Sequence, residues 1–71
     1  MNINIRKSVI DNFKDSNESE IKESINSSIN EKDEITLPGL GVFFEILWSS
    51  SDDEHKNYII NTIMNSIKGN S

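Results

Sequence analysis

The feature that most constrains this chain is a nearly continuous apolar block in its middle. From Leu40 to Trp48, every residue is large and apolar except Gly41 and Glu45. Such a run is too short for periodicity to distinguish a buried helix from a buried strand. We favour a helix, because Pro38 would then lie near its first turn, where the N–H that proline lacks has no helical partner in any case.

The alternative for the same block is a β-hairpin. Residues 34–37 would pair with residues 42–46 across a turn at Pro38 and Gly39, and valine, phenylalanine, isoleucine and tryptophan all suit strands. The fold would then be α+β. A lone two-stranded hairpin is only marginally stable in water, and this favours the helix.

The beginning of the chain predicts a helix over about residues 4–14, with Asn2 or Asn4 as its N-cap. Turn-forming residues at 15–17 mark its end. Its apolar residues fall on one helical face: Ile5, Val9, Ile10 and Phe13.

A second helix is predicted over residues 18–31. Asn17 is its N-cap, and Glu20 stands where a capping box needs a side chain that reaches back to the cap. Its apolar stripe is only one residue wide, so this helix contributes one edge to a core. The stripe consists of Ile21, Ile25 and Ile29.

The last segment begins with a predicted capping box, Ser51-Asp52-Asp53-Glu54, whose acids complement the helix dipole. Gly69 is placed to end this helix. Between these two signals, apolar residues again follow helical spacing: Ile59, Ile60, Ile63, Met64 and Ile67.

These segments together predict a mostly α fold. We expect a single small domain over residues 1–71, a compact four-helix domain that buries the element at residues 40–48 in its centre. A chain of 71 residues without cysteine has no disulfide to stabilise it, so it is marginal unless its core is efficient or a second subunit helps. The predicted core consists of Val9, Ile10, Phe13, Ile25, Leu40, Phe44, Leu47, Trp48, Ile60, Ile63 and Ile67.

The charge balance disfavours several classes of partner. Twelve acidic and seven basic residues give a net charge of −5, whereas nonspecific DNA binding depends on basic side chains that displace counterions from phosphates. The same repulsion disfavours an anionic membrane surface, and no apolar run reaches the roughly 20 residues of a membrane span. The N-terminal residues also lack the apolar stretch of a signal peptide. We therefore expect an intracellular, soluble protein that does not bind membranes, and nucleic acid is a disfavoured partner.

The sequence contains no recognisable catalytic constellation. His55 is the only histidine, and we expect most of the neighbouring acids to point elsewhere on the helix, which leaves an exposed or half-buried surface histidine. No serine lies in a nucleophile elbow, and the Gly-x-Gly at residues 39–41 lacks the lysine of a phosphate-binding loop. We predict that the chain is not an enzyme and has no catalytic, metal-binding or cofactor-binding residues, no cofactor and no small-molecule substrate.

Binding to another protein is the function that these exclusions leave. A core that is open in one chain can close in a homo-dimer, so we expect a second copy or another protein as partner. The candidate surface for this contact is aromatic: Phe43, Phe44 and Trp48. The alternative is a nucleic-acid-associated module that uses the face of Arg6, Lys7 and Lys14, although a solvated face is the simpler interpretation of these residues.

Two segments of the chain are distinctive: residues 2–10, NINIRKSVI, and residues 37–48, LPGLGVFFEILW. Together they resemble the small acid-soluble spore protein I family of spore-forming bacteria. The order of the remaining segments is also similar, so the resemblance covers nearly the whole chain. This chain has isoleucine where leucine is usual at several positions, and it has Ser27 and Ser28 where related chains often carry alanine.

The resemblance implies a protein that is made in the forespore and resides in the spore core. It does not imply the DNA-saturating activity of the major alpha/beta-type spore proteins, and it supplies no catalytic or binding residues to carry over. On this basis we expect a non-enzymatic protein of the spore core, within the forespore cytoplasm, that is structural or associates with itself.

Overall fold

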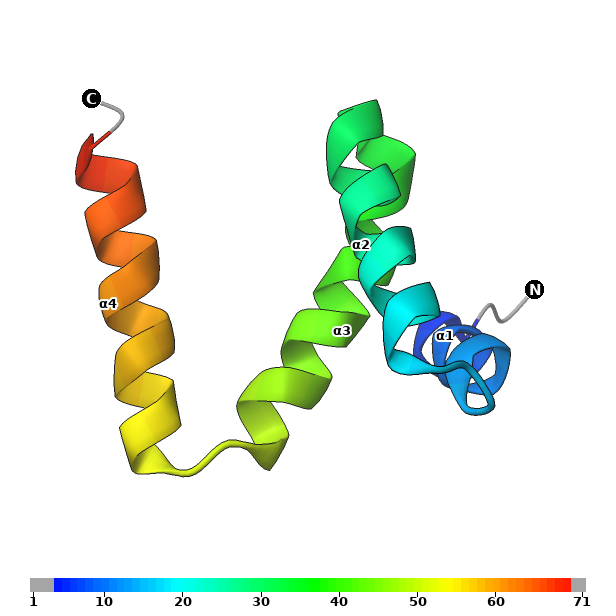
Figure 1. The fold of residues 1–71 in the computed structure, drawn as a ribbon, viewed down its shortest axis with the longest axis horizontal. Coiled ribbons are helices and arrows are strands. Elements are labelled where there is room, and N and C mark those ends of the chain that lie inside the picture. Colours follow the sequence, from blue (N-terminus) through cyan, green and yellow to red (C-terminus); the bar gives the residue numbers. More distant parts are fainter. Residues whose placement is uncertain (1–3, 70–71) are drawn as a thin grey trace.

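The computed structural model describes residues 4–69, which form four α-helices and one short 3₁₀ turn (Figure 1). No strand occurs among these residues, so the mostly α prediction is confirmed and the hairpin of residues 34–37 and 42–46 is excluded. The 3₁₀ turn (Glu34–Thr36) leads directly into the central helix. The four helices are α1 (Ile5–Phe13), α2 (Glu18–Glu31), α3 (Leu37–Ser50) and α4 (Asp53–Gly69).

Helices α1 and α2 begin at the predicted caps. The side chain of Asn4 accepts a hydrogen bond from the backbone N–H of Lys7 at 2.9 Å. At α2 the predicted capping box is present, because Asn17 accepts from the N–H of Glu20 at 2.9 Å and the Glu20 carboxylate accepts from the N–H of Asn17 at 3.4 Å. The other candidate cap of α1, Asn2, lies outside the described residues.

The cap of α4 is one residue later than predicted. The side chain of Asp52 accepts from the backbone N–H of His55 at 2.9 Å, so Asp52 replaces Ser51 as the capping residue. The Ser51 hydroxyl instead donates to the carbonyl of Leu47 at 2.6 Å, within the last turn of α3. Aspartate and serine cap helices about equally well, and the local sequence therefore did not decide between them.

A hydrogen-bonded turn joins α2 to α3. Asp33 accepts from the N–H of Ile35 at 3.1 Å and begins the 3₁₀ turn. The hydroxyl of Thr36 donates to the carbonyls of Asp33, at 2.8 Å, and Ser28, at 3.2 Å. These bonds fasten the start of α3 to the last turns of α2, and α3 begins earlier than the apolar block, with Pro38 in its first turn.

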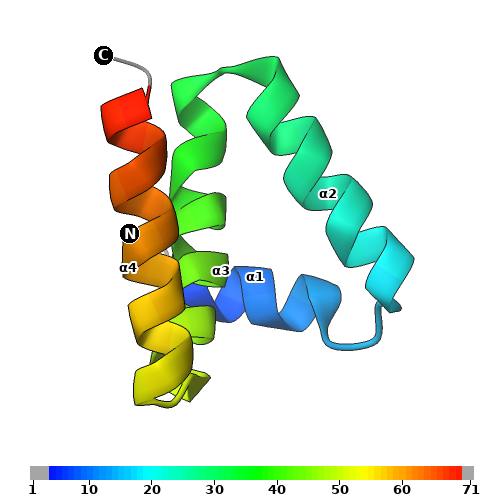
Figure 2. The ribbon, with the colours of Figure 1, turned by 60° about the vertical axis from the view of Figure 1, so that its left-hand side comes forward.

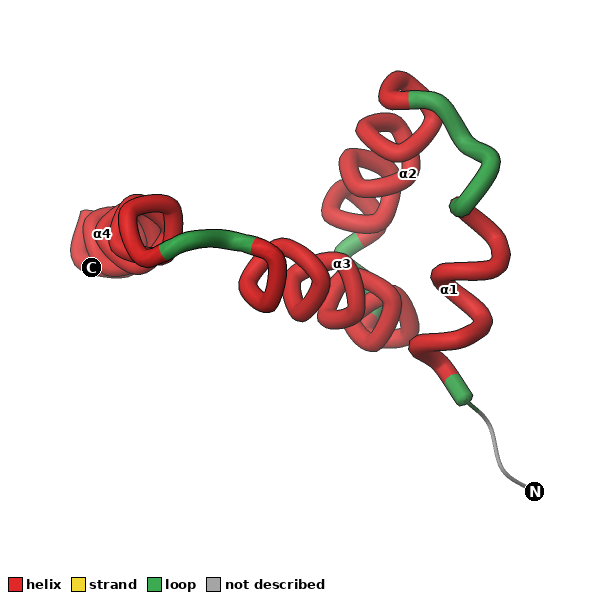
Figure 3. Tube along the Cα trace, turned by 90° about the horizontal axis from the view of Figure 1, so that it is seen from below, coloured by secondary structure: helices red, strands yellow, loops and turns green. Residues whose placement is uncertain are grey.

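Helix α3 is the centre of the fold. Helices α1 and α2 lie on one side of it and α4 lies on the other (Figures 1 and 3). Helix α1 runs across α3 (Figure 2) and packs against it through an edge-on contact of the Phe13 and Phe43 rings, whose centroids are 5.2 Å apart. Val42, only 7% exposed, is the one buried residue within residues 4–69.

The predicted core is wrong for about half of its members. Val42 was not among them, and the predicted burial of the whole element at residues 40–48 holds only for Val42. Five predicted members are half-buried: Val9, Phe13, Ile25, Leu40 and Trp48. The others are exposed: Ile10, Phe44, Leu47, Ile60, Ile63 and Ile67. Most of these exposed residues belong to α3 and α4, because α4 diverges from the other helices and leaves both surfaces without a covering element (Figure 1).

The divergence of α4 makes the molecule extended. Its radius of gyration is 13.8 Å, whereas a compact chain of this length has about 11 Å. Within the part of the chain that the structure describes, no helix combines the length and the apolar character that crossing a membrane requires.

Candidate interaction surface on helices α3 and α4

The two sides of α3 have different surroundings. On the side of α1, Phe43 contacts Phe13, and the guanidinium of Arg6 binds Glu45. On the side of α4, Phe44 stacks on Trp48 with ring centroids 6.0 Å apart. The candidate aromatic surface is therefore divided, since Phe43 contacts α1 whereas Phe44 and Trp48 lie together away from it.

A bidentate ion pair joins α1 to α3. Arg6 Nε donates to Glu45 Oε1 at 2.6 Å, and Arg6 Nη2 donates to Glu45 Oε2 at 2.8 Å. The hydrogen bonds from Arg6 lower the pKa of the Glu45 carboxyl, and those to Glu45 raise the pKa of Arg6. Both side chains are largely exposed, at 68% and 47%, so water and salt screen the pair and it orients α1 more than it stabilises the fold.

The ion pair also separates the residues of the candidate nucleic-acid face. Arg6 is bound to an acidic residue of α3. Lys7 and Lys14 are exposed and stand seven positions apart, on the same side of α1. Because one of the three cations is already neutralised, the structure does not assemble Arg6, Lys7 and Lys14 into one basic patch.

His55 and Asp52 form an exposed pair at the start of α4. The Nδ1 atom of His55 lies 2.6 Å from Asp52 Oδ1, so Asp52 is an exception to the expectation that most neighbouring acids point elsewhere. The pKa of Asp52 is lowered by the hydrogen bond from the His55 backbone N–H and further by the His55 side chain. Within residues 4–69, no group of three or more potential ligand residues is placed to hold a metal ion. The pair therefore acts as a helix cap.

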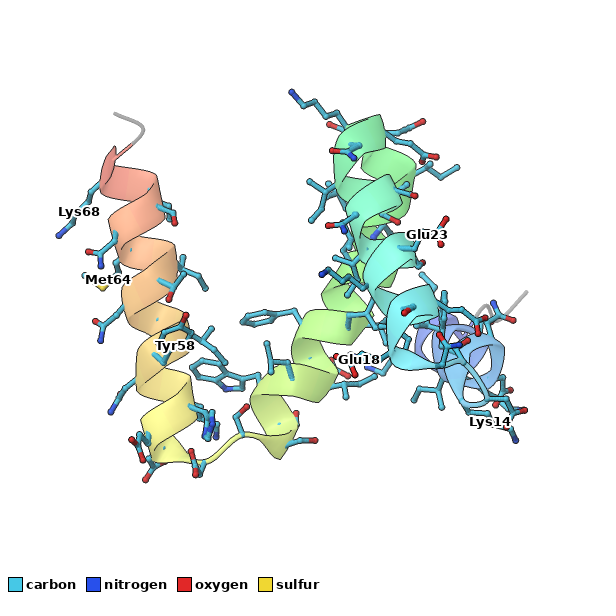
Figure 4. All side chains as sticks on the ribbon, viewed as in Figure 1. Lys14, Glu18, Glu23, Tyr58, Met64 and Lys68 are labelled. Atoms are coloured by element: carbon cyan, nitrogen blue, oxygen red, sulfur yellow. The ribbon has the colours of Figure 1, made fainter. Side chains whose placement is uncertain are left out.

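The base of α4 contacts α3 through a cation–π interaction. The ammonium of Lys56 lies 5.4 Å from the centroid of the Trp48 ring. Farther along α4 the side chains of Met64 and Lys68 point away from α3 (Figure 4). Toward the far end of α4, Met64 is 45% exposed and Ile67 is 67% exposed.

We define the α4 stripe as the exposed apolar residues of this helix that share one side, Ile60, Ile63, Met64 and Ile67. Their exposed fractions range from 39% at Ile63 to 67% at Ile67. On α3, Phe44 and Leu47 are exposed to a similar degree. Exposed apolar side chains that gather in this way make α3 and α4 the candidate interaction surface.

Comparison with known proteins decides the family. The family model described as small, acid-soluble spore protein I matches residues 3–67. The chain belongs to the small, acid-soluble spore protein I family. It is therefore a sporulation protein, and the resemblance noted at residues 2–10 and 37–48 is confirmed.

Curated relatives extend over nearly the whole length of this spore protein. It is 37% identical over 68 residues to a small, acid-soluble spore protein I of Bacillus velezensis, with 96% of each chain covered. The corresponding protein of Bacillus subtilis is 34% identical, again with 96% of each chain covered. The corresponding protein of Halalkalibacterium halodurans is 36% identical, and the match covers 89% of this chain and 93% of that protein. No solved structure matches.

The distinctive block of this small, acid-soluble spore protein is helix α3. Residues 37–48 supply Phe43 and Glu45 to the contact with α1, and they supply Phe44 and Trp48 to the opposite side. Sequence patterns located this block, but they did not reveal that its two sides have separate roles. The spacing of the aromatic residues carries that signal, since Phe43 and Phe44 are adjacent and so point about 100° apart on a helix.

Proposed function

We propose that this spore protein is a non-enzymatic structural protein of the spore core that works by associating with itself. The observation that carries the proposal is the exposed apolar surface of α3 and α4, which a folded chain of this size does not leave open without a partner. Membership of a spore protein family supports the location in the spore.

The distribution of charge supports self-association over binding to nucleic acid. The acidic residues cluster in and around α2 and at the first turn of α4, whereas α3 has Glu45 as its one charged residue, and that residue is paired with Arg6. Two copies can therefore approach through α3 and through residues 57–67 of α4, which carry no charged side chain, without bringing their acidic clusters together. Nucleic acid would meet the acidic surface, with Lys7 and Lys14 as the remaining cations of the candidate face.

Crosslinking inside intact spores tests the proposal. Spores that carry a tagged and an untagged copy of the chain are crosslinked, opened and analysed by mass spectrometry, with and without nuclease. We expect peptides that join two copies of the chain, in equal amounts in both samples, and recovery of the protein only after the spore core is opened. Crosslinks to nucleic acid alone, or release of the protein with the outer spore layers, would contradict the proposal.

A further inference from the structure

The chain exposes more surface than a compact monomer of its mass. The chain exposes 6202 Å² of surface, and a compact monomer of 8.1 kDa exposes about 4,500 Å². The excess is greater than the roughly 800 Å² that each partner buries in a stable protein–protein interface. A second copy of the same chain would remove such an excess from both molecules at once.

The charges of α4 identify the orientation in which a second copy fits. Residues 57–67 contain no charged side chain. Asp53 and Glu54 lie in the first turn of the helix and Lys68 lies in the last. Lys56, the one lysine near the acidic end, is turned onto the Trp48 ring of its own α3. Two α4 helices that run antiparallel would place the acids of one beside the lysine of the other, at both ends and with opposed helix dipoles. Two parallel helices would instead bring like charges together at each end.

We infer that the α4 helices of two copies pair antiparallel through the α4 stripe, in a two-fold symmetric dimer. This inference rests on the self-association proposed above and specifies its interface. A two-fold axis between Asn61 and Thr62 puts Ile60 of one copy opposite Ile63 of the other. The same axis brings Lys68 within one residue of the level of Glu54 in the second copy.

Closure of α4 onto its own α3 is the competing arrangement, and the linker opposes it. The linker contains only Ser51 and Asp52. Ser51 is fastened to α3, because its backbone N–H donates to the carbonyl of Trp48 at 3.3 Å and its hydroxyl donates to Leu47. Asp52 is fastened to α4 through His55. Because Ser51 is held to α3 and Asp52 to α4, only the few backbone torsions between these two residues can turn α4 toward α3, whereas pairing with a second copy needs no such turn.

Sedimentation equilibrium of the full chain measures the association. We expect a dimer, and we expect Ile63→Glu to raise its dissociation constant on the order of 100-fold, because a charge would enter the apolar centre of the interface. Ile35→Glu is the matched control, since Ile35 is 79% exposed in the 3₁₀ turn and should leave the dissociation constant unchanged. Equal weakening by both variants would overturn the proposed interface. Circular dichroism verifies that both variants keep their helices.

Spin labels test the orientation without any change to the stripe. The chain has no cysteine, so single cysteines at the exposed positions Asn57, Asn61 and Asn65 carry one label each. Each residue of displacement from the two-fold axis separates the two labels by about 3 Å along antiparallel helices. The distance between copies should therefore be shortest at Asn61 and longer at both other sites.

The outcomes distinguish the orientation from the self-association itself. A dimer with equal distances at all three sites contradicts antiparallel pairing but leaves self-association in place. A chain that stays monomeric up to about 1 mM contradicts both. A minimum at Asn61, together with dissociation by Ile63→Glu alone, establishes the antiparallel α4 pair.

Discussion

Helices α1 and α4 are both amphipathic and both lie next to α3, but they are held in different ways. Helix α1 packs against α3 through two phenylalanine rings and a bidentate ion pair, whereas α4 touches α3 at Trp48 and Lys56 and then diverges. An apolar stripe thus does not by itself place a helix in the core of its own chain. Where the stripe has no facing surface, as on α4, it remains available to another molecule.

The largest expected effect comes from removing an aromatic ring from each of the two helices. Phe13→Ala should lower the free energy of unfolding by about 2 kcal/mol, because the half-buried ring contacts Phe43. Tyr58→Ala, which removes a 71% exposed ring from α4, should change it by less than about 0.5 kcal/mol. Urea unfolding followed by circular dichroism measures both. Similar losses for the two variants would show that α4 is packed as firmly as α1.

A smaller change in stability, of opposite sign, is expected from a substitution in α3. Gly41 lies inside this helix and a methyl group there would meet no atom within 4 Å. Gly41→Ala should therefore raise the stability of the chain by about 0.5–1 kcal/mol, since alanine favours the helix. Gly69→Ala, at the last residue of α4, is the control and should have little effect. If Gly41→Ala is destabilising in thermal denaturation, another part of the molecule must approach this glycine.

The smallest expected effect is a pH-dependent change in the stability of the first turn of α4. The pKa of Asp52 is lowered in the folded chain by its bonds to His55, so its contribution to stability is complete above the ordinary pKa of aspartate. The contribution is lost as the pH falls through the lowered pKa. Asp52→Asn should keep the cap but remove this dependence, because asparagine caps helices equally well.

Hydrogen exchange of the first-turn amides of α4, measured between pH 2 and 6, follows the change at Asp52. The native chain should lose protection in this turn toward acid, and Asp52→Asn should show a nearly flat profile after correction for the intrinsic exchange rate. The amides of α1, which Asn4 caps without a titrating group, serve as an internal reference. A fall in protection of equal size at both helices would indicate general acid unfolding.

The positions of the helices could be predicted from the sequence because their signals are local. The capping box of Asn17 and Glu20 needs only residues three positions apart, and it is present as predicted. The start of α4 was displaced by one residue for the same local reason, since both Ser51 and Asp52 can cap. Local signals also predicted correctly that the apolar block forms a helix and not a hairpin.

The core and the candidate surface could not be predicted to the same extent, because they depend on which faces meet. Val42 is buried where α1 crosses α3. No local sequence pattern predicts where two helices cross. Phe43 and Phe44 are identical in chemistry, yet one contacts α1 and the other stacks on Trp48. The sequence grouped three aromatic residues into one candidate surface. Only the tertiary contacts show that Phe43 lies apart from Phe44 and Trp48.

The two-residue linker between α3 and α4 has a mechanical consequence. Helix α4 has 17 residues and is about 25 Å long, so it acts as a rigid arm that pivots at Ser51 and Asp52. A rotation of about 10° at the linker would move the far end of the arm by about 4 Å, roughly half the spacing of two packed helices. Because Ser51 is bonded to α3 and Asp52 to α4, the direction of the whole arm is determined by the few backbone torsions between these two residues.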